Sequence, residues 1–260
     1  LHLHPVRGQV DLNLGILIAT LSGIAFCLWL ASHASWPVAL LAALGFALLG
    51  NTCYALMHEA VHLHFHPTPW INEGAGRILA GTFPTAFALQ RVFHLTHHAN
   101  NRSTAERFDY YAPHENRVIK VLQWYSILTG LYWLALPAFA VVYFLTADLI
   151  GWRHLLSRRG DWFARQTSAR EFLEALGRVP VWRARADIAI AFCVQLALIL
   201  ALDVTLAGWL LCYAAFAFAW SSLQYTDHAF SPLDAEEGAW NLKVSPLIRR
   251  VLAHNPSPFS

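Results

Sequence analysis

Long apolar stretches alternate with short polar ones along the chain. Residues 12–31 and 38–57 each supply about twenty mostly apolar positions, the length that a helix needs to cross a bilayer. A short turn without basic residues separates them. Residues 187–202 and 204–223 repeat this arrangement on either side of Asp203. The pattern predicts two transmembrane helical hairpins.

The intervening segments predict shorter or broken elements. Residues 71–90 are moderately apolar but interrupted by glycines and Pro84, which favours an interfacial or re-entrant element. Residues 118–152 are apolar with Pro137 at their centre, too long for one straight span and short for two, so we expect a helical hairpin or a kinked re-entrant pair. Residues 153–185 are rich in arginine and predict an amphipathic surface segment or an ordinary cytoplasmic loop. The fold class is therefore an all-α, polytopic membrane bundle.

Composition and charge placement agree with this topology. The 260 residues are 57% hydrophobic and 13% charged, about half the charged fraction of soluble proteins. Lys and Arg are absent from residues 8–76, 121–152 and 186–242. All basic residues then lie on one side of the spans, which the positive-inside rule makes cytoplasmic. We expect an integral, multi-pass protein of a bacterial inner membrane. The net charge of +2 does not indicate nucleic-acid binding.

The polar chemistry concentrates in two histidine motifs. His58-Glu-Ala-Val-His62 ends the second apolar run, and His94-Leu-Thr-His97-His98 follows about thirty residues later. On a helix, positions i, i+3 and i+4 share one face, so each motif can direct its imidazoles to one point. Imidazole binds iron, zinc, copper and nickel, so the two motifs indicate a metal centre. The topology predicts that this centre lies at the cytoplasmic face.

Other metal sites fit the sequence less well. The first motif has the letters H-E-x-x-H of a zinc peptidase, but such a peptidase does not need the second motif. The four cysteines lie in apolar runs, which argues against a disulfide framework and favours packing thiols. Histidines without cysteine ligands or a dense set of carboxylates argue against iron–sulfur and calcium sites.

Taken together, H-E-A-V-H, H-L-T-H-H and a later histidine after paired spans resemble the integral-membrane fatty acid desaturase and hydroxylase superfamily. The resemblance covers nearly the whole chain. It implies two non-haem iron ions that activate dioxygen to remove hydrogen from an unactivated C–H bond. The implied electron donor is a separate ferredoxin or small haem protein. By motif, the implied metal ligands are His58, His62, His94, His97, His98 and His228.

Further residues near these motifs are candidates for lesser roles. Gln224 lies four residues before His228 and is a candidate for contact with the metal through water. Asp109 and Asp227 could orient imidazole N–H groups, although solvated loop carboxylates are the alternative. His64 and His66 are expected at the interface.

The chain departs from the family pattern near its C-terminus. The family has a third histidine box about thirty residues after the position of His228, where this chain has His254 followed by Ser257 and Pro258. We therefore expect residues 1–260 to be a single desaturase-like domain truncated at the C-terminus, with His254 as a further candidate ligand. The predicted function is oxygen-dependent desaturation of a fatty acyl lipid. A membrane di-iron hydroxylase or ketolase acting on lipid, alkane or carotenoid is the alternative, and an inactive membrane scaffold is another.

Overall fold

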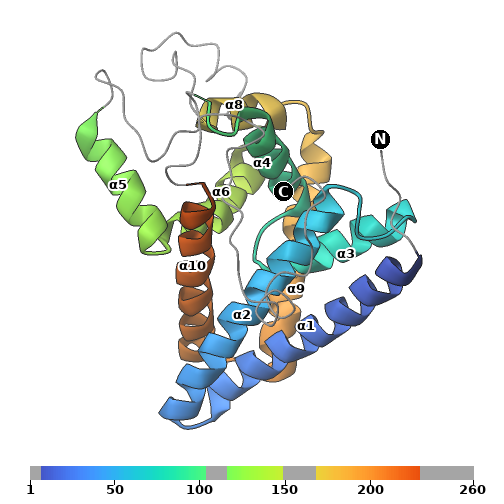
Figure 1. Ribbon diagram of the computed structural model, residues 1–260, viewed down its shortest axis with the longest axis vertical. Helices are drawn as coiled ribbons and strands as arrows, with labels where there is room; N and C mark the ends of the chain where they lie inside the picture. Colours follow the sequence, from blue (N-terminus) through green and yellow to red (C-terminus); the bar gives the residue numbers. More distant parts are fainter. Residues whose placement is uncertain (1–6, 104–115, 149–167, 229–260) are drawn as a thin grey trace.

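The described part of the chain consists of helices and connecting loops, without a strand (Figure 1). This computed structural model describes residues 7–103, 116–148 and 168–228. In chain order the helices are α1 (Arg7–His33), α2 (Trp36–Val61), α3 (Pro69–Thr82), α4 (Phe87–Asn100), α5 (Arg117–Leu128), α6 (Leu131–Thr146), α8 (Ser168–Leu176), α9 (Val181–Leu202) and α10 (Leu206–His228). The predicted all-α class is confirmed.

Four helices are long and apolar enough to cross a bilayer, namely α1, α2, α9 and α10. Helices α1 and α2 pack along each other as the first predicted hairpin, whereas α9 and α10 are joined by a short turn at Asp203 and diverge from it. One boundary differs from the prediction. Helix α9 begins at Val181, so Arg183 and Arg185 belong to the first turns of a span and not to a surface segment. Arginine tolerates such a position because its apolar stem can lie along the helix while its charged head reaches polar partners.

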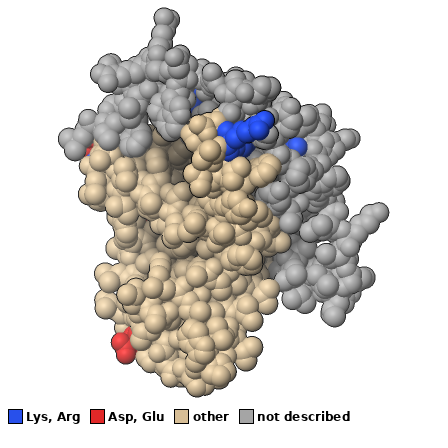
Figure 2. Space-filling view, turned by 90° about the vertical axis from the view of Figure 1, so that its left-hand side faces the viewer, with Lys and Arg blue, Asp and Glu red and all other residues tan. Residues whose placement is uncertain are grey.

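The turns of the two hairpins lie side by side at one end of the bundle, at the bottom of Figure 1. The Nε2–H of His33 donates to the Leu202 carbonyl at 3.1 Å, and the Thr205 amide donates to the Ser32 hydroxyl at 3.1 Å. Asp203 ends α9 in the left-handed conformation, with φ 49°. The opposite end of α2 carries the first histidine motif, and we call it the histidine end. Figure 2 shows Lys and Arg gathered toward that end of the face in view.

Small residues let α2 and α10 approach closely in the core. The Phe46 ring packs edge-on against Tyr213, with ring centroids 4.9 Å apart. A Cβ at Gly50 would lie only 2.4 Å from the Phe216 ring, so glycine is required for this contact. Small residues serve this role between membrane helices, where packing has to supply the association energy.

Residues 71–90 do not form the single broken element predicted from the sequence. They belong to two helices, α3 and α4, separated by a short break that contains Pro84. Gly74, Gly76 and Gly81 lie within α3 and do not interrupt it. Around Gly76 and Gly81 neighbouring side chains fill the space that the missing Cβ atoms leave, whereas nothing lies within 4 Å of a Cβ at Gly74. A Cβ at Gly76, for example, would meet the Phe87 ring at 2.3 Å.

The C-terminal end of α3 is buried between spans, and its last carbonyls find partners there. Gln195 of α9 donates to the Gly81 carbonyl at 2.8 Å, and the Tyr213 hydroxyl of α10 donates to the Thr82 carbonyl at 2.7 Å. Helix ends leave four carbonyls without intrahelical partners, and hydrocarbon offers no water to satisfy them. These two side chains therefore stabilise the inserted end of α3.

Helices α5 and α6 form the bent pair expected in residues 118–152, with 97° between their axes. The sequence suggested Pro137 as the centre of the bend, but Pro137 lies within α6. The break is at Gly130, which has φ 81°. A Cβ there would lie 2.7 Å from the Phe218 backbone nitrogen, so close packing on α10 fixes the position of the break.

Helix α8 is the described helix of the basic segment 153–185 that precedes α9, and it covers α4. Its apolar residues Phe172, Leu173 and Leu176 pack into a small core with residues of α4, α6 and α9. Its polar side carries the pair of Arg170 with Glu174 at 2.8 Å. This amphipathic packing is what the sequence predicts for the segment.

Candidate metal centre

The first histidine motif lies where α2 ends. His58 is in the last turn of the helix and His62 is its C-cap, so the two imidazoles lie on one side, with ring centroids 4.7 Å apart. The His62 amide still bonds to the His58 carbonyl at 3.1 Å. The apolar run that precedes the motif makes α2 a span, and this span delivers both imidazoles to the histidine end.

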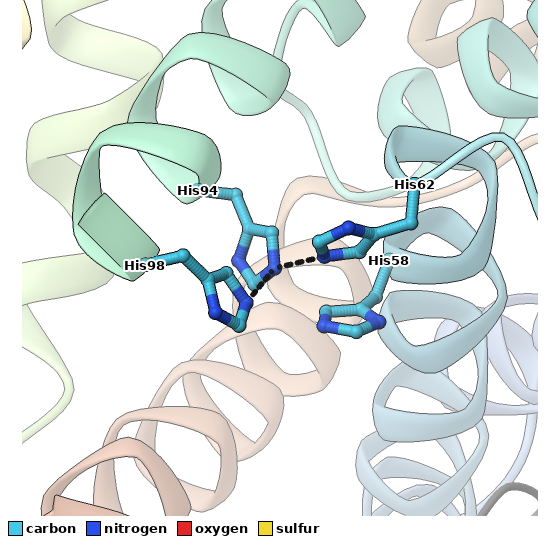
Figure 3. Close-up of side chains that lie close together, drawn as sticks. All are labelled: His58, His62, His94 and His98. Atoms are coloured by element: carbon cyan, nitrogen blue, oxygen red, sulfur yellow. Dashed lines mark hydrogen bonds between the residues drawn. The ribbon is translucent and has the colours of Figure 1, made fainter. Parts of the chain in front are cut away.

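The second motif lies in the last two turns of α4. His94 and His98 are four residues apart and face α2, as Figure 3 shows. His94 is 7% exposed, and its ring is 4.4 Å from those of both His58 and His98. One nitrogen from each of His58, His62, His94 and His98 lies within 4.8 Å of the other three. The structure thus brings together imidazoles from two helices that are far apart in sequence.

The distances within the cluster suit a shared metal ion. His94 Nε2 is 3.0 Å from His62 Nε2 and 2.8 Å from His98 Nε2. Histidine nitrogens lie about 2.0–2.1 Å from bound zinc, and two ligands at right angles on an ion of that size are about 3 Å apart. Neutral imidazoles offer one donor and one acceptor each, so a single hydrogen bond cannot satisfy three nitrogens that meet at one point. A cation satisfies all of them, and the residues therefore fit a metal centre.

Burial and repulsion from neighbouring imidazoles lower the pKa of two of the four histidines, His62 and His94. Burial lowers the pKa of His94 far below the usual 6.5, and repulsion from the neighbouring imidazoles lowers it further. For His62, burial and then repulsion from His58 and His64 lower the pKa to about 4. Glu59 acts in the opposite direction. Because a metal binds the neutral ring, both side chains are in the ligating form at neutral pH.

Glu59 lies beside the cluster, close to His58 of the group and to the neighbouring His64. One carboxylate oxygen is 3.5 Å from His58 Nδ1, and the other is 3.9 Å from His64 Nδ1. A carboxylate near the outer nitrogen of a ligating histidine orients the ring and raises its basicity. In the sequence Glu59 stood out only as the glutamate of the H-E-x-x-H letters. Its contact with His58 instead allows an orienting role.

The other histidines of these segments lie outside the group of four. The His97 ring is 6.4 Å from that of His94 and 6.0 Å from that of His98. The His64 ring is 6.0 Å from that of His62. His66 accepts a hydrogen bond from the Thr68 amide at 2.9 Å and so stabilises the loop after α2. A ligand role for His97 stays a prediction.

The remaining candidate residues cannot be located relative to the cluster. Gln224 and His228 belong to α10, but the description of that helix does not extend to their side chains. The same holds for Asp227. Asp109 and His254 lie outside the described residues. Their predicted roles stay predictions.

Several residues that contact the histidine helices were not singled out by the sequence. Asn72, Glu73 and Arg77 of α3, Arg91 of α4 and Asp187 of α9 form a polar network beside the cluster. The sequence contains one indication of this network, because Glu73, Arg77 and Asp187 are charged residues within segments that are largely apolar. Such residues need partners when they are buried.

Comparison with known proteins identifies the family. A model of the family described as "Fatty acid desaturase" matches residues 34–256, most of the chain. A comparison with curated proteins finds no match. The match includes both histidine motifs, α2 to α10 and the four imidazoles that meet between α2 and α4. On this evidence the chain belongs to the fatty acid desaturase family.

Proposed function

We propose that this protein is an oxygen-dependent membrane desaturase that introduces a double bond into a fatty acyl chain, using a histidine-ligated centre of two iron ions. The observation that carries the proposal is the meeting of four imidazoles from both histidine motifs in a chain of this family. Such a centre, when loaded, activates dioxygen for removal of hydrogen from an unactivated C–H bond. The described residues contribute candidate ligands, lower the pKa of His62 and His94, and place His58 and His62 at the end of an apolar span.

His58, His62, His94 and His98 are the proposed ligands that the geometry supports directly. Two iron ions need more ligands than these four, and His97 and His228 are proposed to supply them, with Gln224 acting through water and His254 as a further candidate. His97 is adjacent to His98 at the end of α4, and His228 is the last residue of α10. Each can be tested singly by substitution.

The setting of the cluster supports a lipid substrate. His58 and His62 lie at the end of α2, a candidate span with an apolar exposed surface, so an acyl chain dissolved in the bilayer can approach the cluster from the hydrocarbon side. Lys and Arg gather toward the same end (Figure 2), which supports a cytoplasmic active face by the positive-inside rule. Electrons are proposed to come from a separate ferredoxin or small haem protein that reaches this face.

Metal analysis and product analysis together test the proposal. We expect the purified protein to contain iron, and to convert an acyl substrate to an unsaturated product when supplied with reductant and oxygen. His94→Ala should remove the metal and the activity. His33→Ala is the matched control, because His33 lies at the opposite end of the bundle, where it donates to the Leu202 carbonyl. Stoichiometric zinc without iron would contradict the proposal, and a hydroxylated product would favour the hydroxylase alternative.

A further inference from the structure

The N-terminus of helix α4 is capped by a side chain of another helix. Its N-cap residue, Ala86, has no side-chain acceptor for the free backbone amides of the first turn. The carboxylate of Asp187, from α9, accepts from the Ala88 amide at 2.9 Å. Asp187 is 2% exposed and also binds Arg77 Nε at 2.7 Å, so the carboxylate is fixed in place. A carboxylate is favourable at this end of the helix dipole.

A second contact joins α4 directly to α2. Arg91 lies one turn before His94 and donates to Glu73 of α3 at 2.5 Å. Its other terminal nitrogen donates to the Ala60 carbonyl at 3.4 Å. Ala60 is the residue of α2 midway between His58 and His62. The planar guanidinium thus spans the gap between the two helices that supply the imidazoles.

The Ala60 carbonyl is held from a second direction as well. Asn72 of α3, 1% exposed, donates to it at 2.8 Å and accepts from the His66 amide at 3.3 Å. This carbonyl, among the last four of α2, also accepts from the Leu63 amide at 3.2 Å in the turn that follows the helix. The end of α2 is therefore tied to α3 and α4 at the point from which its two histidines project.

The several partners of Glu73 make it possible to distinguish the contact of Arg91 with α2 from a general effect on protein stability. Besides Arg91 it binds Arg183 of α9 at 3.1 Å and lies 3.7 Å from Arg77. Loss of Arg91 therefore leaves the carboxylate paired. Arg183 reaches the same carboxylate from another helix, so the two arginines share a partner, but Arg91 alone of the two lies on the helix of the second motif.

We propose that Arg91 is a positioning residue of the histidine site, which fixes α4 against α2 so that His94 and His98 meet His58 and His62, while Asp187 holds the N-terminus of α4 on α9. The inference rests on the proposed function for the identity of the bound metal, but its geometry stands without it. Ligand nitrogens about 3 Å apart bind one ion only while the helices keep their register, and a site of this kind tolerates errors of only about 0.5 Å. Arg91 projects from α4, and its guanidinium contacts both Ala60 of α2 and Glu73 of α3, so it is suited to hold that register.

The test compares Arg91→Leu with Arg183→Leu in the full chain. Each variant is purified without metal and titrated with iron(II) under anaerobic conditions, and separately with zinc(II). We expect Arg91→Leu to bind metal about 10–100-fold more weakly than the wild type, the usual loss when a residue supporting the ligands is removed. Arg183→Leu should bind like the wild type. Arg91→Lys should be intermediate, since an ammonium keeps the pairing with Glu73 but cannot fork to Ala60.

A second measurement needs no metal. Hydrogen exchange of the α4 amides should be faster in metal-free Arg91→Leu than in the wild type or Arg183→Leu, whereas exchange in α1 should be equal in all three. Equal metal affinities for Arg91→Leu and the wild type, or equal losses for both leucine variants, would overturn the inference. So would unchanged exchange in α4. If the wild type binds zinc but no iron, the proposed function fails, while the comparison of variants with zinc still decides the positioning role.

Discussion

Removing the side-chain amide of Gln195 should destabilise the bundle by disconnecting the inserted end of α3. Gln195 Nε2 donates to the Gly81 carbonyl at 2.8 Å and to the Tyr213 hydroxyl at 2.9 Å, and Gln195 Oε1 accepts from Trp209 Nε1 at 3.0 Å. Methionine has nearly the same length and shape as glutamine but forms none of these bonds. Gln195→Met therefore tests the hydrogen bonds with little change in packing volume.

The expected loss follows from the number of groups left without partners. Hydrogen bonds between membrane helices contribute about 0.6 kcal/mol each, so loss of the three would cost about 2 kcal/mol. A buried carbonyl or N–H without a partner costs about 1–3 kcal/mol, and the Gly81 carbonyl and Trp209 N–H both lose theirs. We expect Gln195→Met to lower the free energy of unfolding by about 2–4 kcal/mol.

Unfolding in mixed detergent micelles, followed by tryptophan fluorescence, measures this change. Gln123→Met on α5 is the matched control, because the Gln123 side chain is exposed and its loss should leave stability unchanged. Tyr213→Phe removes one member of the same network, and its effect should not add to that of Gln195→Met, since residues in one network are coupled by about 0.5–3 kcal/mol. A loss below about 0.5 kcal/mol for Gln195→Met, or strict additivity in the double variant, would refute the reasoning.

Three other outcomes are expected. His97→Ala should lower iron content less than His94→Ala does, because His97 lies outside the group of four; equal losses in metal analysis would place His97 among the central ligands. Gly76→Ala should lower the thermal unfolding temperature, because overpacking against Phe87 costs about 1–3 kcal/mol. Gly74→Ala should leave that temperature unchanged, because nothing lies within 4 Å of its Cβ. Similar unfolding temperatures for the two variants would contradict the close contact at Gly76. Burial favours a raised pKa for Glu73, but the arginines around it lower the pKa below 4.5 overall. The stabilising contribution of the ionised Glu73 should therefore be complete above pH 4.5 and disappear as the pH falls through the lowered pKa. Glu73→Gln should make the free energy of unfolding less dependent on pH in that range, and an unchanged dependence would count against the ion pairs.

The sequence determined the class of the fold and the composition of the candidate site. Runs of about twenty apolar residues must be helical in a bilayer, because lipid offers no partner for backbone N–H and C=O groups. That rule gave the hairpins of α1 with α2 and of α9 with α10. The spacing of His58 with His62, and of His94 with His98, placed each pair on one helix face for the same local reason. These conclusions depend only on residues close together in the chain.

Tertiary structure decided how these helices meet. Nothing local indicates that the end of α2 faces α4, that Asp187 caps α4 from 99 residues away, or that Arg91 spans the gap to Ala60. The break at Gly130 likewise depends on contact with Phe218 of α10 and not on Pro137. In a water-soluble helix the apolar stripe shows which face is buried, but a membrane helix is apolar on all sides. Which faces pair is then set by the fit of small residues and by a few polar contacts, and these exist only once the helices have packed.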